Sequence, residues 1–287
     1  MDISIIIVNY NTLKITKDCI DSIVAQTHFV NYEIILVDNN STDGSREYFD
    51  MRSDIKYVYS NTNLGFGRAN NLGLNYANGK FIFLLNSDTI LCNNSLYEFY
   101  KYAVACKEFG CLGCQLFAKD GSLSPSFGYF LTIKRVLKDC LMSYLKFFCK
   151  FNIKVTCDVN LEYIPEMIIG AALFIRKETI EKYGMFDERY FMYHEENDME
   201  RRYSLNGLKN IIIPGPRIIH LESQSTLLSF NKVVMSTSSL FIYIKKWNSN
   251  LSYYLFRIIY FFLRVPFVLS SKLDCNQKLV YLKLLMQ

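Results

Sequence analysis

The chain has 287 residues, enough to bury a sizeable core, and 51% are hydrophobic, which excludes a disordered chain and argues against a protein with many membrane spans. Its net charge of +5 is too small to single out nucleic acid as a partner, although it suits an anionic ligand or a membrane surface. The nine cysteines are scattered, and the first residues carry neither a basic segment nor a cleavage site, so we expect a protein of the reducing cytoplasm.

Apolar runs alternate with helical patterns along the first third of the chain. The β-branched run at residues 3–8 predicts a strand buried on both faces, and Thr12 is a candidate cap for the helix that follows. The further predicted elements are strands at 33–38, 55–59 and 81–85 and a helix at 68–77 that stops at Gly79. This alternation predicts an α/β fold, with a mostly parallel central sheet flanked by helices.

Polar residues follow three of the predicted strands, at Asp38, 61–65 and 86–88. Because parallel strands end at one edge of a sheet, we expect a ligand site there. The stretch 63–70 contains G-x-G, but the third glycine of a dinucleotide fingerprint would fall on Asn70, which argues against a dehydrogenase. Arg68 suits either a phosphate contact or an ordinary surface salt bridge.

Cys111 and Cys114 form a C-x-x-C pair without a second pair or histidines at zinc-site spacing. We therefore interpret them as two small buried hydrophobic residues.

Six motifs in succession resemble the signatures of family 2 glycosyltransferases, over residues 3–225. They are NYN at 9–11, VDNNSTDGS at 37–45, NLGF at 63–66, LNSDT at 85–89, GAALFIRK at 170–177 and FDERYFMYHEEND at 186–198, with a histidine after them at 220. The rhamnosyltransferase-like branch that builds bacterial surface polysaccharides is the most similar part of the family.

The resemblance implies the GT-A fold. A glycosyltransferase domain would occupy 1–225, with the donor half at about 1–115 and the acceptor half at about 116–225. Beyond the part that the resemblance covers, residues 226–287 are expected to form a C-terminal helical extension that associates with a membrane.

The resemblance also implies a nucleotide-sugar site, with Asp38 hydrogen-bonded to the nucleobase. Its residues would be Asn9, Asn11, Asp38, Asn63, Gly65, Arg68, Asn86 and Ser87. Asp88 would be the metal-binding acid of the D-x-D element, whose first acid is replaced here by Asn86, which leaves one carboxylate fewer. Mg²⁺ or Mn²⁺ is expected, because both prefer oxygen ligands and neutralise a diphosphate leaving group.

Two further roles follow from the resemblance. Glu196 would be the catalytic base, preferred over Glu195, although aspartate is commoner at this position; crowding of acids would raise a pKa toward the useful range. The alternative for these acids is the acidic first turn of a helix, where anions are favoured. His220 would lie near the metal and diphosphate, or else be an ordinary core side chain. The i,i+4 pair Asp198–Arg202 is interpreted as structural.

Two apolar and basic stretches, 127–151 and 251–269, suggest a membrane surface. In the second stretch Arg257 and Arg264 share one helical face, and Pro266 interrupts the pattern, so an in-plane amphipathic helix fits better than a membrane span. The alternative is that these helices pack on the catalytic domain or on another subunit.

We therefore expect an inverting transferase that moves a sugar from a dTDP- or UDP-linked donor to a glycan or lipid-linked oligosaccharide acceptor, at the inner face of the cell membrane. No nucleic acid partner is expected, and a homo-oligomer stays open. Two alternatives remain: a non-catalytic subunit of a glycan-assembly complex, and a sugar-nucleotide nucleotidyltransferase, although residues 9–12 lack the glycine-rich, basic loop of the latter.

Overall fold

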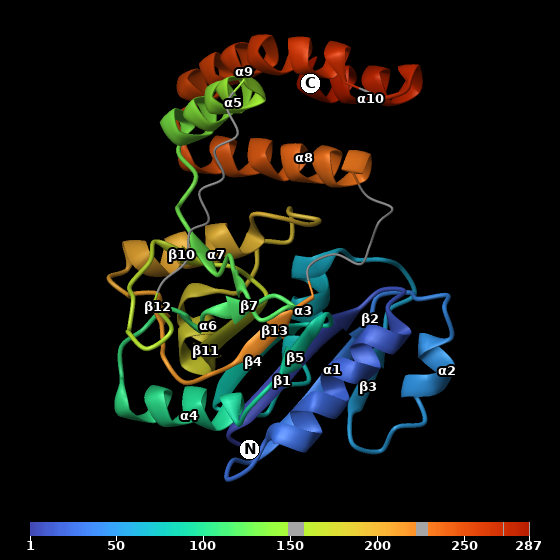
Figure 1. The fold of residues 1–287 in the computed structure, drawn as a ribbon, viewed down its shortest axis with the longest axis vertical. Coiled ribbons are helices and arrows are strands. Elements are labelled where there is room, and N and C mark those ends of the chain that lie inside the picture. Colours follow the sequence, from blue (N-terminus) through green and yellow to red (C-terminus); the bar gives the residue numbers. More distant parts are fainter. Residues whose placement is uncertain (149–157, 222–228, 272, 287) are drawn as a thin grey trace. The chain divides into compact units, whose positions relative to one another are not determined.

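A computed structural model describes residues 1–148, 158–221, 229–271 and 273–286, and packing divides the chain into two compact units (Figure 1). The sheet unit comprises residues 1–129, 154–191 and 195–224, and the helical unit comprises 130–153, 192–194 and 225–287. Residues 130–148, which we expected in the acceptor half, thus pack in the helical unit. The functional boundary near residue 225 stays a prediction.

The sheet unit is built on a seven-stranded sheet of order β12-β6-β11-β4-β1-β2-β3. Strands β1 to β4 run parallel to one another, and β11 is antiparallel to both β4 and β6. The prediction of a mostly parallel sheet is confirmed. The strands are β1 (Ile3–Asn9), β2 (Tyr32–Asp38), β3 (Lys56–Tyr59), β4 (Phe81–Asn86), β6 (Leu112–Gly113), β11 (Ala172–Arg176) and β12 (Ile211–Ile212).

The strands are continuous apolar runs because both faces of the sheet are covered. Ile5 and Ile7 of β1 enter one hydrophobic cluster and Ile6 enters the other, and all three are fully buried. Cys111 and Cys114 likewise lie in different hydrophobic clusters, and their side chains are 0% and 1% exposed. They are therefore the small buried core residues that the sequence indicated.

The helices of the sheet unit flank the sheet (Figure 1). They are α1 (Leu13–Gln26), α2 (Ser45–Phe49), α3 (Phe66–Leu74), α4 (Ser95–Ala105), α6 (Lys177–Tyr183) and α7 (Glu195–Leu205).

The predicted side-chain cap of α1 and both predicted ends of α3 were wrong. The Thr12 side chain makes no cap; its hydroxyl donates to Asn9 Oδ1 at 2.8 Å, while the N–H of Leu13 donates to Asp43 Oδ2 at 2.9 Å. Helix α3 begins at Phe66 rather than Arg68, because Gly65 adopts φ 81° and turns the chain directly into the helix, and it ends at Leu74 rather than Ala77.

Short strands complete the sheet unit. A four-stranded sheet of order β5-β13-β7-β8 places His220 opposite Thr89 in the β5–β13 pairing. The strands are β5 (Thr89–Leu91), β13 (Ile218–His220), β7 (Leu116–Phe117) and β8 (Leu123–Ser124), and a separate pair joins β9 (Phe127–Gly128) to β10 (Met167–Ile168).

The helical unit contains α5 (Ile133–Phe148), α8 (Ser229–Trp247), α9 (Asn250–Ser270) and α10 (Cys275–Met286). Helix α9 packs against the other three. By length and composition alone, α9 is the one helix among the described residues that could cross a membrane.

Candidate active site at the strand ends

The polar ends of the parallel strands meet at one edge of the sheet. Asn9 of β1 is level with Asp38 of β2, and Val8 of β1 is level with Asn86 of β4. The structure thus brings together Asn9, Asp38 and Asn86, which the sequence singled out and which are at least 29 positions apart in the chain.

Asp38 and Asn9 lie below the surface of this edge and are 0% exposed. Asp38 accepts hydrogen bonds from the Ser41 N–H (2.7 Å), the Tyr57 hydroxyl (3.0 Å) and Asn9 Nδ2 (3.4 Å). Its carboxylate therefore shapes the loop after β2, and its contact with a nucleobase stays a prediction. Nothing in the sequence marked Tyr57, whose pKa is raised by burial and by the charge of Asp38.

Asn11 closes the same loop from the β1 side. Its Oδ1 accepts from the Thr42 N–H at 2.7 Å, and its own N–H donates to Ser41 Oγ at 2.9 Å. Asn11 has φ 54°, a left-handed conformation that asparagine tolerates better than most residues. The two loops therefore form one hydrogen-bonded rim with Asn11 exposed on it.

The loop after β3 is tied to the loop after β2 through amide groups. Asn39 Nδ2 donates to Asn63 Oδ1 (2.9 Å) and to the Gly65 carbonyl (3.1 Å). A Cβ at Gly65 would lie 2.1 Å from the carbonyl oxygen of Phe191, which accepts from the Phe66 N–H at 2.8 Å. The missing side chain of Gly65 thus makes room for the chain's own Phe191.

Arg68 is exposed, and its Nε donates to the carbonyl of Glu188 at 2.7 Å. That bond joins α3 to the segment before α7. A phosphate contact by Arg68 stays a prediction.

The pair Asp88–His220 lies beyond the end of β4. Because β13 pairs with β5, His220 Nε2 is 3.2 Å from Asp88 Oδ1, and the two side chains are 13% and 25% exposed. His220 Nδ1 and Asn86 Oδ1 are buried without a hydrogen-bond partner in the described structure. Buried polar atoms without partners are rare, and these two belong to the residue that contacts Asp88 and to the residue two positions before it. Ser87, between these residues, is half-buried.

The Asp88–His220 pair fits a hard divalent cation only in part. It offers one carboxylate oxygen and one imidazole nitrogen, and the described residues contain no cluster of three or more acidic, histidine or cysteine ligands. A Mg²⁺ or Mn²⁺ ion takes about six ligands, so diphosphate and water would have to supply the remainder.

The two candidate bases begin α7. Glu195 is 3% exposed, whereas Glu196 is half-buried and packs beside Gly170, where an added Cβ would lie 3.6 Å from Glu196 Cδ. The neighbouring Ala171 carbonyl accepts from the Asn86 N–H at 2.9 Å. Glu196 is thus linked to the end of β4 through the backbone at Gly170 and Ala171.

One acid that sequence reasoning missed lies one turn further along α7. Burial raises the pKa of the fully buried Glu200 well above its usual range; the Ile168 N–H, 2.7 Å from Oε2, lowers it, and the charge of Glu196 raises it. Only the fold brings Glu200 against β10, so no local pattern marked it.

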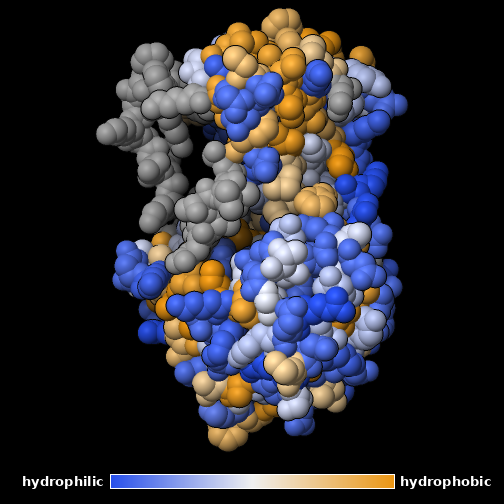
Figure 2. All heavy atoms as spheres, turned by 90° about the vertical axis from the view of Figure 1, so that its right-hand side faces the viewer, coloured by the Kyte–Doolittle hydropathy of each residue, from blue (hydrophilic) through white to orange (hydrophobic). Residues whose placement is uncertain are grey.

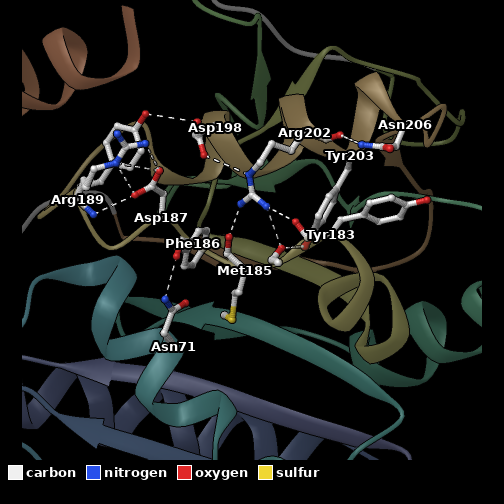
Figure 3. A network of polar contacts seen from close by, with 12 residues as sticks. Asn71, Tyr183, Met185, Phe186, Asp187, Arg189, Asp198, Arg202, Tyr203 and Asn206 are labelled. Atoms are coloured by element: carbon white, nitrogen blue, oxygen red, sulfur yellow. Dashed lines mark hydrogen bonds and ion pairs between the residues drawn. The ribbon is translucent and has the colours of Figure 1, made fainter. Parts of the chain in front are cut away.

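A hydrogen-bond network fixes the approach to α7 (Figure 3). Arg202 pairs with the fully buried Asp198 at 3.3 Å and donates to the carbonyls of Tyr183, Gly184 and Met185 at the end of α6. The structural interpretation of the Asp198–Arg202 pair is confirmed.

The same segment is held from the other side by α3. Asn71 Nδ2 donates to the Phe186 carbonyl at 2.9 Å, and Gly67 lies close enough that an added Cβ would be 3.3 Å from Phe186 Cβ (Figure 3 shows Asn71 and Phe186). The loop before α7 is therefore clamped between α3 and α7, which holds Glu195 and Glu196 in place.

Comparison with known proteins identifies glycosyltransferases as relatives. A family model described as Glycosyl transferase family 2 matches residues 4–141. The glycosyltransferase GlyG of Streptococcus pneumoniae serotype 4 is 36% identical over 103 residues, which are 34% of this chain and 34% of GlyG. The N-acetylglucosaminyl-diphospho-decaprenol L-rhamnosyltransferase of Mycobacterium tuberculosis is 25% identical over 67% of each chain.

Among solved structures, the mannosyltransferase PcManGT of Pyrobaculum calidifontis, described with GDP-Man and Mn²⁺, superposes with a TM-score of 0.58. The sequences are 15% identical, and the match covers 99% of this chain and 72% of that one. The expected GT-A fold is confirmed.

Proposed function

The chain belongs to glycosyl transferase family 2, in its rhamnosyltransferase-like part, and on that premise we propose that it is an inverting, metal-dependent sugar transferase. The donor would be a dTDP- or UDP-linked sugar. The acceptor would be a glycan or lipid-linked oligosaccharide of a bacterial surface polysaccharide.

The observation that carries this proposal is the Asp88–His220 pair beside Asn86. A carboxylate oxygen and an imidazole nitrogen 3.2 Å apart, next to two buried polar atoms without partners, suit a cation and the phosphates it binds. A bound Mg²⁺ or Mn²⁺ would neutralise the charge that develops on the leaving diphosphate.

The chain's own residues would then orient the reaction. Asp88 and His220 would fix the position of the diphosphate at the end of β4. The rim formed by Asn11, Asn63 and their neighbours would hold the nucleoside, with its loop shape set by the buried Asp38.

Glu196 is proposed as the base that accepts the proton of the acceptor hydroxyl. Gly170 leaves room beside its carboxylate, and the network around Arg202 restricts the helix that carries it. Glu195 is almost fully buried, which supports the choice of Glu196.

The acceptor class indicates where in the cell the protein would act. The M. tuberculosis relative is named for a decaprenol-linked acceptor, and a lipid-linked acceptor would bring this protein to the inner face of the cell membrane, from the cytoplasm. The helical unit would supply the membrane contact.

Thermal unfolding with UDP, dTDP, GDP and CMP, each with and without Mn²⁺, tests the donor site. We expect UDP or dTDP with Mn²⁺ to raise the midpoint, because a ligand that binds only the folded state stabilises it. Asp88→Asn should abolish the Mn²⁺-dependent part of this rise in the midpoint. It should also reduce the rate of sugar transfer at least about 100-fold, since it removes an electrostatic contribution to the transition state. Asp18→Asn, at an exposed position of α1, is the matched control.

An Asp88→Asn variant that keeps both the Mn²⁺-dependent shift and full transfer would contradict the metal assignment. A wild-type chain that no nucleotide stabilises would favour the alternative of a non-catalytic glycan-assembly subunit.

A further inference from the structure

The helical unit differs sharply from the rest of the chain in charge. Residues 130–153, 192–194 and 225–287 contain thirteen lysines and arginines against two aspartates and no glutamate, whereas the whole chain contains 32 basic and 27 acidic residues. The remaining residues therefore hold 19 basic and 25 acidic side chains. The positive charge of this protein is concentrated in the helical unit.

Helix α9 turns an apolar face to the outside. The six large hydrophobic side chains of this outer face lie at positions i, i+3, i+4, i+7, i+11 and i+18, which is one side of a helix. Each is more than half exposed: Leu251 (72%), Tyr254 (59%), Leu255 (52%), Ile258 (56%), Phe262 (69%) and Leu269 (59%). In the space-filling view, apolar side chains gather over the helical unit (Figure 2).

The opposite face of α9 is committed to the helical unit. Arg257 donates to the carbonyls of Leu284 (3.3 Å) and Leu285 (3.0 Å) of α10, and Arg264 donates to the Tyr281 hydroxyl at 3.3 Å. A membrane span would have to break these bonds and carry both arginines into hydrocarbon, at a high energetic cost. The geometry therefore allows the outer face to contact lipid only with α9 lying along the surface.

Basic side chains lie near both ends of α9. Lys245 Nζ lies 5.8 Å from the Tyr253 ring near the start of α9, and Lys278 Nζ donates to the Leu269 carbonyl at 3.1 Å near its end. Long basic side chains at the ends of an apolar face can keep their ammonium groups at headgroup level while the face enters the acyl region.

We propose that the outer face of α9 is a membrane-docking surface that lies in the plane of an anionic lipid bilayer. The inference deepens the proposed function, on which it rests only for the statement that the acceptor is carried by that bilayer. A second copy of the chain is a poorer occupant, because two units with thirteen basic and two acidic residues each repel one another, whereas anionic headgroups attract them.

The test is co-sedimentation of the full chain with vesicles of phosphatidylglycerol and phosphatidylcholine, compared with phosphatidylcholine alone. Wild type should bind the anionic vesicles, and less so at 0.5 M salt. The double variant Ile258→Glu/Phe262→Glu should bind at least about tenfold more weakly, because two apolar side chains no longer leave water. Phe29→Glu, at a residue of the sheet unit that is 86% exposed, is the matched control and should bind like wild type.

A second variant tests the contribution of the basic side chains without changing the apolar face. Lys245→Gln/Lys278→Gln should reduce the preference for anionic vesicles while leaving the outer face unchanged. The nucleotide-induced thermal shift should be the same in wild type and in both double variants. A chain that binds vesicles as described but shows no nucleotide shift would count against the proposed function and leave the docking surface standing.

Three results would overturn the inference. One is equal vesicle binding by wild type and Ile258→Glu/Phe262→Glu. Another is a wild-type dimer in light scattering that this variant converts to monomer without a change in vesicle binding. The third is a membrane-bound chain that resists alkaline carbonate extraction, which would indicate a span.

Discussion

Gly65→Ala should damage both the stability of this protein and its proposed donor site. Gly65 has φ 81° and ψ −176°, a combination that is almost restricted to glycine. Its missing side chain also makes room for the carbonyl of Phe191, so the substitution disturbs the junction between the loop after β3 and the segment before α7.

The magnitude follows from two separate costs. Backbone strain in this region costs about 1–3 kcal/mol. The new Cβ would lie 2.1 Å from Phe191 O, where about 3.2 Å is the shortest tolerable contact, so the two segments must separate by roughly 1 Å. That movement stretches the Phe66–Phe191 hydrogen bond, worth about 1 kcal/mol. We expect a loss of about 2–4 kcal/mol in the free energy of unfolding.

The assay is urea denaturation of wild type and variant, with nucleotide affinity measured on the folded fraction. Gly121→Ala is the matched control: Gly121 has φ 80°, but nothing lies within 4 Å of its added Cβ. The control should lose only about 1 kcal/mol, the cost of the backbone conformation. If Gly65→Ala loses no more free energy of unfolding than Gly121→Ala and binds nucleotide normally, the steric clash with Phe191 has no energetic effect and the reasoning is refuted.

Two other substitutions probe the α7 region. The pKa of Glu200 is raised in the folded state, so its contribution to the free energy of unfolding is full below the unfolded pKa and is lost as the pH rises toward the folded pKa. The stability of Glu200→Gln relative to wild type should therefore be higher at pH 8 than at pH 5, by up to about 1.4 kcal/mol per pH unit between the two pKa values. Denaturation of wild type and variant at both pH values measures this effect. A difference in the free energy of unfolding that is the same at pH 5 and pH 8 would contradict the prediction. An equal pH-dependent change for Glu181→Gln, at an exposed position, would also contradict it. Arg202→Lys should cost about 2–3 kcal/mol in unfolding experiments, because one ammonium cannot serve three carbonyls and the buried Asp198, whereas the exposed Arg217→Lys should cost little; equal losses would rule out the clamp.

The parallel strands were predictable because burial on both faces demands unbroken apolar runs. The run 3–8 became β1 (Ile3–Asn9) and the run 81–85 became β4 (Phe81–Asn86). The edge at which their polar ends meet follows from parallel pairing alone.

The details that failed depend on contacts between distant segments. The first turn of α1 is satisfied by Asp43, 30 positions away from Leu13, and not by the neighbouring Thr12. The Tyr57 hydroxyl that donates to the buried Asp38 belongs to a strand residue that no motif marks, while the nucleobase contact of Asp38 stays a prediction. A single sequence records the residue types at such places but not the geometry that satisfies them.

Because of the β5–β13 ladder, the proposed diphosphate end of the site can form only late in synthesis. Asp88 and His220 are 132 positions apart, and only the pairing of Thr89 with His220 brings the imidazole to the carboxylate. A ribosome-bound chain that has emerged only through the β1–β4 region would hold half of this pair. With the proposed function, sugar transfer would therefore begin only when nearly the whole sheet unit has been translated, so a nascent or prematurely ended chain would not consume activated sugar.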